Sequence, residues 1–242
     1  MNQRLSATDA QHLHDVAAAM RAAIGQVIVG QHGMTELMLA ALLSEGHVLL
    51  EGPPGVAKTL AVRTMARLVD CSFGRIQCTP DLMPADILGT NIFNPKTLEF
   101  EYRRGPVFAN LLLTDEINRS PAKTQSALFE VMEERQTTSD GTSHAMPSPF
   151  MVLATMNPIE QEGTYRLPEA QLDRFIVKIV IDYPSLAEET EIIRRHHEQG
   201  APAERSGVTP LLKHDDITRY ARLVRTVTVE PGIFSYIASI VH

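Results

Sequence analysis

The stretch Gly52-Pro53-Pro54-Gly55-Val56-Ala57-Lys58-Thr59 decides the fold, and it follows the apolar run His47-Val48-Leu49-Leu50. A strand, a glycine-bearing loop and Lys-Thr at a helix start together form a cradle for the phosphates of a nucleoside triphosphate, because loop N–H groups and the helix N-terminus attract anions. Lys58 is expected to reach the β- and γ-phosphates, and the Thr59 hydroxyl is expected to bind Mg²⁺. Ala57 stands where glycine usually precedes the lysine, so the motif alone is moderately specific.

Length and composition describe an ordinary protein with a hydrophobic core. The chain has 242 residues, enough for one sizeable domain and a smaller one, and 44% of them are hydrophobic. Its apolar runs are strand-length, and the polar N-terminus lacks the apolar segment of a signal peptide. We therefore expect a cytoplasmic protein with no membrane insertion. Cys71 and Cys78 are expected to be buried free thiols, and the nine histidines show no metal-ligand spacing.

Alternation of apolar strand-like and helix-like segments predicts an α/β fold, a parallel sheet with helices on both faces. The run Leu111-Leu112-Leu113 has no polar alternation, as expected of a strand buried on both sides. A helical pattern from Met34 to Leu42 is expected to stop at Gly46. Strands are expected at 47–51, 73–77, 111–114, 150–156 and 175–181, and further helices at 8–24, 59–69, 121–134 and 169–174.

Two segments interrupt this alternation and read as inserted β-hairpins. The first, 90–104, contains the period-two pattern of Leu98 to Arg103, and the second, 136–149, contains the turn pair Asp140-Gly141. The alternative is that both are surface loops without a role. After residue 184 the pattern becomes helical, at 185–198, 215–226 and from 231 onward. We therefore expect a nucleotide-binding α/β core at 1–184 and a helical lid at 185–242.

An acidic pair follows the buried strand, in Leu113-Thr114-Asp115-Glu116. Carboxylates at the C-terminal end of a parallel strand lie beside a phosphate loop in the same sheet. Asp115 is expected to hold Mg²⁺ through water, and Glu116 is expected to polarise the attacking water. The alternative, an acidic N-cap for the helix near 121, would be preferred if the phosphate loop were absent.

Two further polar residues end secondary-structure elements. Asn157 follows the apolar run Val152 to Met156, where it could contact the γ-phosphate or serve as a turn residue before proline. Arg174 ends the short helix in Leu172-Asp173-Arg174-Phe175, where it could stabilise the charge of phosphoryl transfer. The alternative for Arg174 is a surface ion pair with Asp173.

The order of these motifs resembles the AAA+ ATPases, and more narrowly the MoxR family, over about residues 10–240. Highly specific segments carry this resemblance, and the family also tolerates alanine at position 57. The segments are Val27-Ile28-Val29-Gly30-Gln31, the phosphate loop, Gln77-Cys78-Thr79-Pro80-Asp81-Leu82-Met83-Pro84-Ala85-Asp86, Asp115-Glu116-Ile117-Asn118-Arg119-Ser120-Pro121-Ala122-Lys123-Thr124-Gln125 and Gly163-Thr164-Tyr165-Arg166-Leu167-Pro168-Glu169-Ala170-Gln171.

The resemblance implies ATP and Mg²⁺ as cofactors and assigns roles by position. Asn157 matches sensor 1, and Arg174 matches the arginine finger that acts on a neighbouring subunit's ATP, with Arg166 a weaker second candidate. Lys58, Asp115 and Glu116 match phosphate-binding, metal and catalytic residues. The residues expected to contact nucleotide are Val29, Gly30, Gln31, Gly52, Pro53, Pro54, Gly55, Val56, Ala57, Lys58, Thr59 and Leu60.

The family comparison also implies a homo-oligomer, a hexameric ring, and a partner with a von Willebrand factor A domain. The two hairpins match the helix-2 insert and pre-sensor-1 hairpin, which face the ring pore or a partner. No counterpart of the family's sensor-2 arginine can be placed before His242. The expected activity is ATP-driven remodelling of partner proteins.

Three other activities stay open from the sequence. An ATP-binding switch with negligible turnover is the first alternative. A DNA-dependent motor is disfavoured by the net charge of −7 and by a hairpin tip, 140–143, without basic residues. A small-molecule kinase would leave Arg174 and the hairpins without a role.

Overall fold

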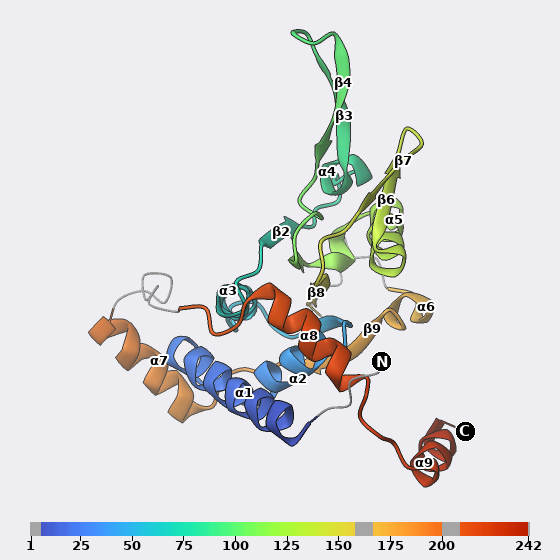
Figure 1. The fold of residues 1–242 in the computed structure, drawn as a ribbon. Coiled ribbons are helices and arrows are strands. Elements are labelled where there is room, and N and C mark those ends of the chain that lie inside the picture. The colour runs from blue at the N-terminus through green and yellow to red at the C-terminus, as the bar shows by residue number, and fades with distance from the viewer. Residues whose placement is uncertain (1–5, 158–166, 200–208, 242) are drawn as a thin grey trace.

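A five-stranded parallel sheet forms the centre of the protein, as expected (Figure 1). The computed structural model describes residues 6–157, 167–199 and 209–241. The strand order is β2-β5-β8-β1-β9, and each strand's bounds agree with the prediction to within one residue. The strands are β1 His47–Glu51, β2 Phe73–Gln77, β5 Leu111–Asp115, β8 Met151–Met156 and β9 Phe175–Val180.

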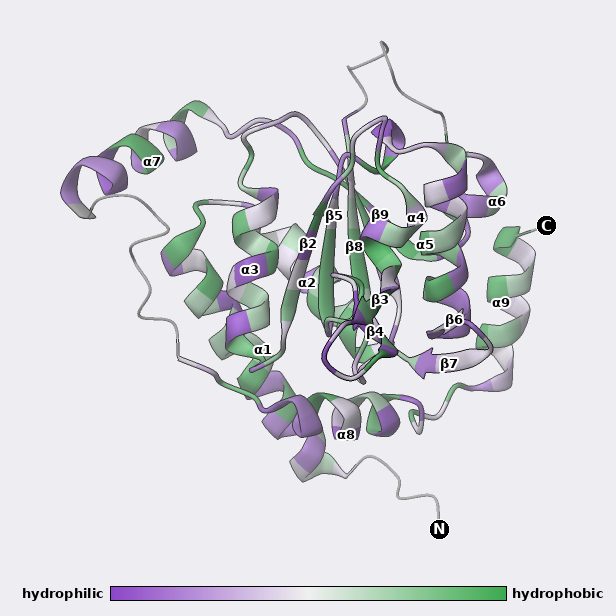
Figure 2. Cartoon of the chain, turned by 90° about the horizontal axis from the view of Figure 1, so that it is seen from above, coloured by the Kyte–Doolittle hydropathy of each residue, from purple (hydrophilic) through white to green (hydrophobic). Residues whose placement is uncertain are grey.

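Helices cover both faces of this sheet (Figure 2). One core joins the strands to α1 Ala7–Val27, α2 His32–Leu43, α3 Lys58–Leu68 and α8 His214–Val224. The other joins them to α4 Pro84–Leu88 and α5 Ala122–Glu134. Leu111 and Leu113 face the first core and Leu112 faces the second, which explains the uninterrupted apolar run of β5.

Two antiparallel hairpins project from the core, and both were predicted (Figure 1). They are β3 Gly89–Asn94 with β4 Glu99–Arg104, and β6 Gln136–Ser139 with β7 Thr142–Ala145. Asp140 and Gly141 both have positive φ (47° and 77°), the conformation of a two-residue hairpin turn. The hairpins contact each other, because the rings of Tyr102 and His144 stack with centroids 4.2 Å apart.

A polar cap and a left-handed residue mark the ends of two helices. Ser6 caps α1, since its hydroxyl accepts a hydrogen bond from the N–H of Asp9. At the end of α2, Glu45 rather than Gly46 adopts the left-handed conformation (φ 54°). Gly46 is needed for packing instead, because a Cβ there would lie 2.6 Å from the Ile176 side chain.

The C-terminal helices differ in how they pack. Helix α8 contributes Ile217, Tyr220 and Leu223 to the core, whereas α9 Pro231–Val241 has no buried residue and stands apart in Figure 1. In the sequence, α7 Leu186–Gln199 follows β9 and precedes α8. The division into a core at 1–184 and a lid at 185–242 stays a prediction. Among the described residues, no helix is both long enough and apolar enough to cross a membrane.

Candidate nucleotide site

The loop between β1 and α3 approaches the sheet closely and turns sharply. A Cβ on Gly52 would lie 2.4 Å from the carbonyl oxygen of Ile181, so only glycine fits there. Pro53 is buried next to it, while Pro54 and Gly55 are exposed. Ala57 precedes α3 in the left-handed conformation (φ 61°), which explains why glycine is the usual residue at this position.

Lys58 and Thr59 begin α3 beside this loop. The Nζ of Lys58 donates a hydrogen bond to the carbonyl oxygen of Gly52 over 2.7 Å, so the lysine folds back over its own loop. Burial lowers the pKa of Lys58, and the nearby carboxylates of Asp115 and Glu116 oppose that shift. The loop therefore presents a cation and the N-terminus of α3 together, which favours an anionic ligand.

The carboxylate of Asp115 is largely buried at the end of β5 and has three partners. Its Oδ2 accepts from Nε of Arg75 at 2.8 Å and from Oγ1 of Thr59 at 3.5 Å. Its Oδ1 accepts from Oγ1 of Thr155 at 3.3 Å. The phosphate loop and the acidic strand, 56 residues apart, thus meet at one carboxylate. Asp115 does not cap α5, whose N-cap position is Pro121.

Glu116 leaves β5 in the left-handed conformation (φ 57°), which turns its side chain away from the sheet ladder. Its Oε2 lies 3.1 Å from Nε of Arg119 and accepts from Nε2 of Gln77 at 3.4 Å. Its backbone N–H donates to Oγ1 of Thr155 over 2.9 Å. Thr155 therefore joins both acidic residues, a role that was not predicted from the sequence.

Asn157 is buried directly after β8, at the same edge of the sheet. Met156, the residue before it, pairs with Glu51 at the end of β1 and accepts a backbone hydrogen bond from Gly52. The structure thus brings together Lys58, Thr59, Asp115, Glu116 and Asn157 at the carboxyl ends of β1, β5 and β8, where parallel sheets bind ligands.

Arg174 lies at the opposite side of the sheet, where the parallel strands begin; we call this row of strand starts the amino edge and the row of strand ends the carboxyl edge. It precedes β9, whose first residue, Phe175, pairs with His47 at the start of β1. Because β1 has five residues, its two ends are about 13 Å apart. Arg174 forms an ion pair with Glu133 of α5, not with Asp173 as one interpretation of the sequence had it. Arg166 lies outside the described residues.

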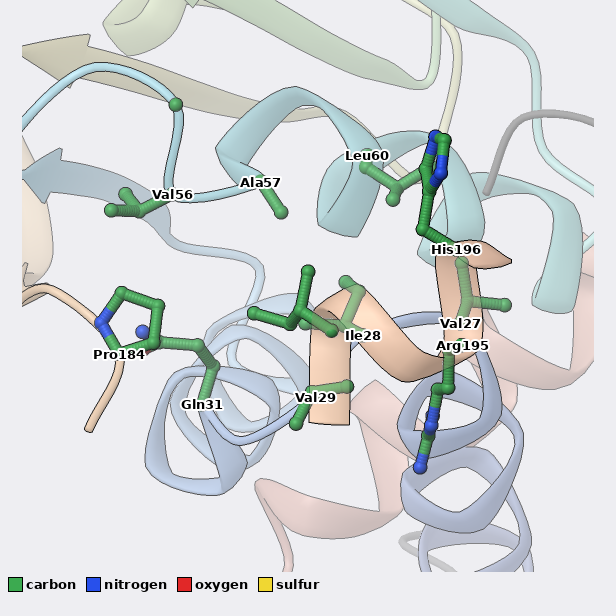
Figure 3. A pocket seen from close by; sticks show the side chains of 12 residues that line it. Val27, Ile28, Val29, Gln31, Val56, Ala57, Leu60, Pro184, Arg195 and His196 are labelled. Atoms are coloured by element: carbon green, nitrogen blue, oxygen red, sulfur yellow. The ribbon is translucent and has the colours of Figure 1, made fainter. Parts of the chain in front are cut away.

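A mostly apolar pocket of ≈ 210 Å³ opens beside the phosphate loop (Figure 3). Val29 and Gln31, two of the residues expected to contact nucleotide, line it together with Val56, Ala57 and Leu60. Gly30 does not, because it faces Glu188, whose Oε1 would lie 2.1 Å from a Cβ at this position. The other lining residues are Val27, Ile28, Gly55, Pro184, Ile192, Arg195 and His196.

Helix α7 forms one wall of this pocket, which sequence patterns did not indicate. Nη1 of Arg195 donates to the carbonyl oxygens of Gly25 and Gln26, at 2.8 and 3.2 Å, in the last turn of α1. The guanidinium thereby satisfies backbone acceptors at a helix C-terminus and fixes α7 against α1. An aromatic base fits such an apolar pocket next to a phosphate loop.

The oxygen donors suit Mg²⁺ held together with a nucleotide. The Thr59 hydroxyl and the Asp115 carboxylate are hard ligands in direct contact, and Mg²⁺ takes few protein ligands alongside water and phosphate. Among the described residues, no cluster of three or more His, Cys, Asp or Glu side chains could hold a metal alone. The site therefore fits a metal that arrives with phosphate.

Comparison with known proteins agrees with this geometry. Residues 47–177 match the family described as "ATPase family associated with various cellular activities (AAA)". "Chaperone MoxR1" of Mycobacterium tuberculosis is 52% identical over 223 residues, covering 90% of this chain and 56% of that protein. The chain belongs to the MoxR family of AAA+ ATPases. It spans only about half the length of MoxR1.

Two further relatives support the MoxR assignment. The uncharacterized protein YeaC of Bacillus subtilis is 47% identical over 232 residues, which cover 96% of this chain and 72% of YeaC. A crystal structure of a candidate ATPase from Cytophaga hutchinsonii superimposes with a TM-score of 0.81 at 42% identity, covering 96% of this chain and 71% of that one. The AAA+ fold predicted from the MoxR-like motifs is thereby confirmed.

Proposed function

We propose that this MoxR-family chain binds Mg-ATP at the carboxyl edge of its sheet and hydrolyses it to ADP and phosphate. The observation that carries the proposal is the contact between Thr59 and Asp115, which joins the phosphate loop to the buried acidic strand. A hydroxyl and a carboxylate in contact beside Lys58 are the groups that hold Mg²⁺ against the β- and γ-phosphates. Membership of an ATPase family supports the same reaction.

Each residue of the edge has a proposed part in this reaction. Lys58 binds the β- and γ-phosphates, while Thr59 and, through water, Asp115 hold the metal. Glu116 polarises the attacking water, and Asn157 orients that water or the γ-phosphate. Bound Mg²⁺ would neutralise negative charge on the phosphates.

We further propose that catalysis needs a second subunit in a homo-oligomer, a hexameric ring. The position of Arg174 supports this, because it stands at the edge of the sheet opposite its own phosphate loop. A guanidinium placed there stabilises the transition state only at a neighbour's nucleotide. Residues 1–184 would form the ring core, and 185–242 part of a lid over the base.

The biological role we propose is remodelling of partner proteins in the cytoplasm, including a protein with a von Willebrand factor A domain. The name of the relative MoxR1, a chaperone, supports the remodelling part. The projecting hairpins β3–β4 and β6–β7 are the proposed contact elements.

The experiment that tests hydrolysis compares Glu116→Gln with the wild type. Loss of the carboxylate that polarises water should reduce phosphate release by about 10²- to 10⁴-fold. Mg-ATP affinity, measured with a fluorescent ATP analogue, should change little. Glu134→Gln, an exposed change of the same kind on α5, serves as the control. Wild-type turnover in Glu116→Gln would refute the assignment of Glu116.

One observation favours a second candidate, the ATP-binding switch. The carboxylate of Glu116 is engaged by Arg119 and Gln77, so it must give up these partners before it can polarise a water. A single-turnover assay distinguishes the two functions. The motor converts bound ATP to ADP at a rate that rises with protein concentration, whereas the switch retains ATP at every concentration.

A further inference from the structure

Arg75 reaches the proposed metal site from the edge strand β2. Its Nε lies 2.8 Å from Oδ2 of Asp115, and its Nη2 donates to Oε1 of Gln77 over 2.9 Å. In the parallel register, Arg75 pairs with Leu113 and Gln77 pairs with Asp115. These side chains therefore point to the same face of the sheet, the one that α3 covers. Strand pairing, rather than a loop, sets the position of the guanidinium.

The burial of the Asp115 carboxylate explains why it forms an ion pair. The side chain of Asp115 is 10% exposed and that of Arg75 is 45% exposed. A buried carboxylate without a cation is costly, and the hydroxyls of Thr59 and Thr155 donate hydrogen bonds without bringing charge. Arg75 supplies that charge, and because its own side chain is 45% exposed, it can move away without becoming a buried cation itself.

The arginine contacts the same oxygen that the metal site needs. Oδ2 of Asp115 is the atom in contact with Oγ1 of Thr59, between which Mg²⁺ and its water are expected. Around it, the carboxylates of Asp115 and Glu116 face the cations Lys58, Arg75 and Arg119. This charge balance opposes a divalent cation until triphosphate brings negative charge.

We propose that Arg75 is a positioning residue that serves as the resident counter-cation of Asp115 and makes divalent-metal binding depend on bound nucleotide. It holds the carboxylate toward Thr59 in the nucleotide-free chain and keeps the bare site from taking up metal. The inference rests on the proposed function, because it assigns Arg75 a role toward the metal of that site.

The test measures binding of Mn²⁺ alone to the nucleotide-free protein by electron paramagnetic resonance. Mn²⁺ has the oxygen preference of Mg²⁺ and a direct signal. Removal of the guanidinium charge in Arg75→Gln should tighten Mn²⁺ binding by about tenfold or more, because one positive charge leaves the metal site. Arg75→Lys and Arg103→Gln, an exposed arginine on β4, should both bind Mn²⁺ as weakly as the wild type.

Superimposable Mn²⁺ curves for wild type and Arg75→Gln would overturn the inference. A purely structural role for Arg75 predicts that result, so the metal readout separates the two. Mg-ATP binding is measured in parallel on all variants. If none of them binds Mg-ATP, the proposed function fails on its own, whatever the Mn²⁺ result. If all bind Mg-ATP and Mn²⁺ affinity is unchanged, only the role of Arg75 fails.

A double-mutant cycle gives a second test of the pairing that does not depend on metal binding. The counter-cation role predicts that Arg75→Gln lowers the melting temperature strongly in the wild type and little in an Asp115→Asn background, where no charge remains to be neutralised. Equal losses of melting temperature in both backgrounds would contradict the pairing. Loss of weak Mn²⁺ binding in Asp115→Asn checks that the metal sits at this carboxylate.

Discussion

The two edges of the central sheet carry opposite kinds of polar group. At the carboxyl edge, the largely buried Asp115 and the partly buried Glu116 and Lys58 lie around a loop with left-handed residues. At the amino edge, Arg174 and Glu133 form an ion pair in which both side chains are 41–50% exposed, and the buried His47 is hydrogen-bonded to two backbone groups. The first edge is built to receive a charged ligand, and the second presents a charge outward.

One copy of the chain therefore holds its proposed nucleotide site and its proposed arginine finger at opposite ends of the strands. Strand β1 separates them. The phosphate loop follows Glu51 at the end of β1, and Arg174 precedes Phe175, which pairs with His47 at the start of β1. A second copy would bring an amino edge to a carboxyl edge.

The largest effect is expected from Arg174→Ala at the amino edge. Loss of the proposed arginine finger should lower turnover by about 10³-fold or more, because a positive charge is removed from the transition state. ATP binding should be unchanged, and stability should fall by less than about 1 kcal/mol because the pair with Glu133 is half-exposed. Phosphate release is measured against protein concentration, with Arg222→Ala as the exposed control.

Mixing two inactive variants sharpens this prediction. An interface between the Glu116 of an Arg174→Ala subunit and the Arg174 of a Glu116→Gln subunit has both groups intact. The mixture should therefore recover part of the wild-type turnover. If the mixture stays inactive although the variants assemble together, Arg174 does not act between subunits.

A smaller effect is expected in the pH response of the amino edge. His47 Nε2 contacts the carbonyl oxygen of Met132 at 3.1 Å, and its Nδ1 accepts from the N–H of Val152 at 3.0 Å. Burial lowers the pKa of His47 from 6.5 to about 4. Between these values the unfolded chain binds a proton that the folded chain does not. The contribution of His47 to the free energy of unfolding is therefore fully present above pH 6.5 and is lost as the pH falls toward 4.

From pH 7.5 to 5, this linkage should remove about 2 kcal/mol of unfolding free energy, measured by urea denaturation. His47→Gln can keep both hydrogen bonds but cannot titrate, so its loss over the same interval should be smaller by that amount. Equal pH slopes in the two proteins would show that His47 does not control this response.

The smallest effect is expected at the carboxyl edge, from Ala57→Gly. The left-handed φ of 61° strains alanine but not glycine, so the substitution should raise the unfolding free energy by about 1 kcal/mol or less. Thermal unfolding measures this effect. Gly25 in the last turn of α1 offers the reciprocal control, since an added Cβ there has open space and Gly25→Ala should stabilise the helix slightly.

Much of the fold could be predicted because local signals and tertiary structure agree. The apolar run of β5, the Asp140-Gly141 turn and the glycine-bearing loop after β1 each determine their own local structure. Short α4, at Pro84–Leu88, was missed because its five residues span fewer than two helical turns, too few for a repeating hydrophobic pattern to show. The left-handed Glu45 was missed because Gly46, next to it, is the commoner choice.

The candidate site was predicted only where a motif names its residues. Arg75 and Thr155 contact Asp115 through strand pairing between segments 40 residues apart, and no local pattern reveals that register. A charged residue inside the strand 73–77 was the one available signal for Arg75. Arg195 reaches α1 across 170 residues of chain, so the wall that α7 adds to the base pocket depends on tertiary packing alone.

The contact between Tyr102 and His144 has a consequence for engineering this molecule. Because the two rings stack, and because Asn91 also donates to Ser139 over 3.4 Å, the hairpins β3–β4 and β6–β7 form a single fork with two prongs. The second hairpin leads into β8, which ends at Met156, directly before the buried Asn157. Replacing one hairpin with that of a relative would remove one ring of the Tyr102–His144 stack, so the two hairpins should be exchanged together.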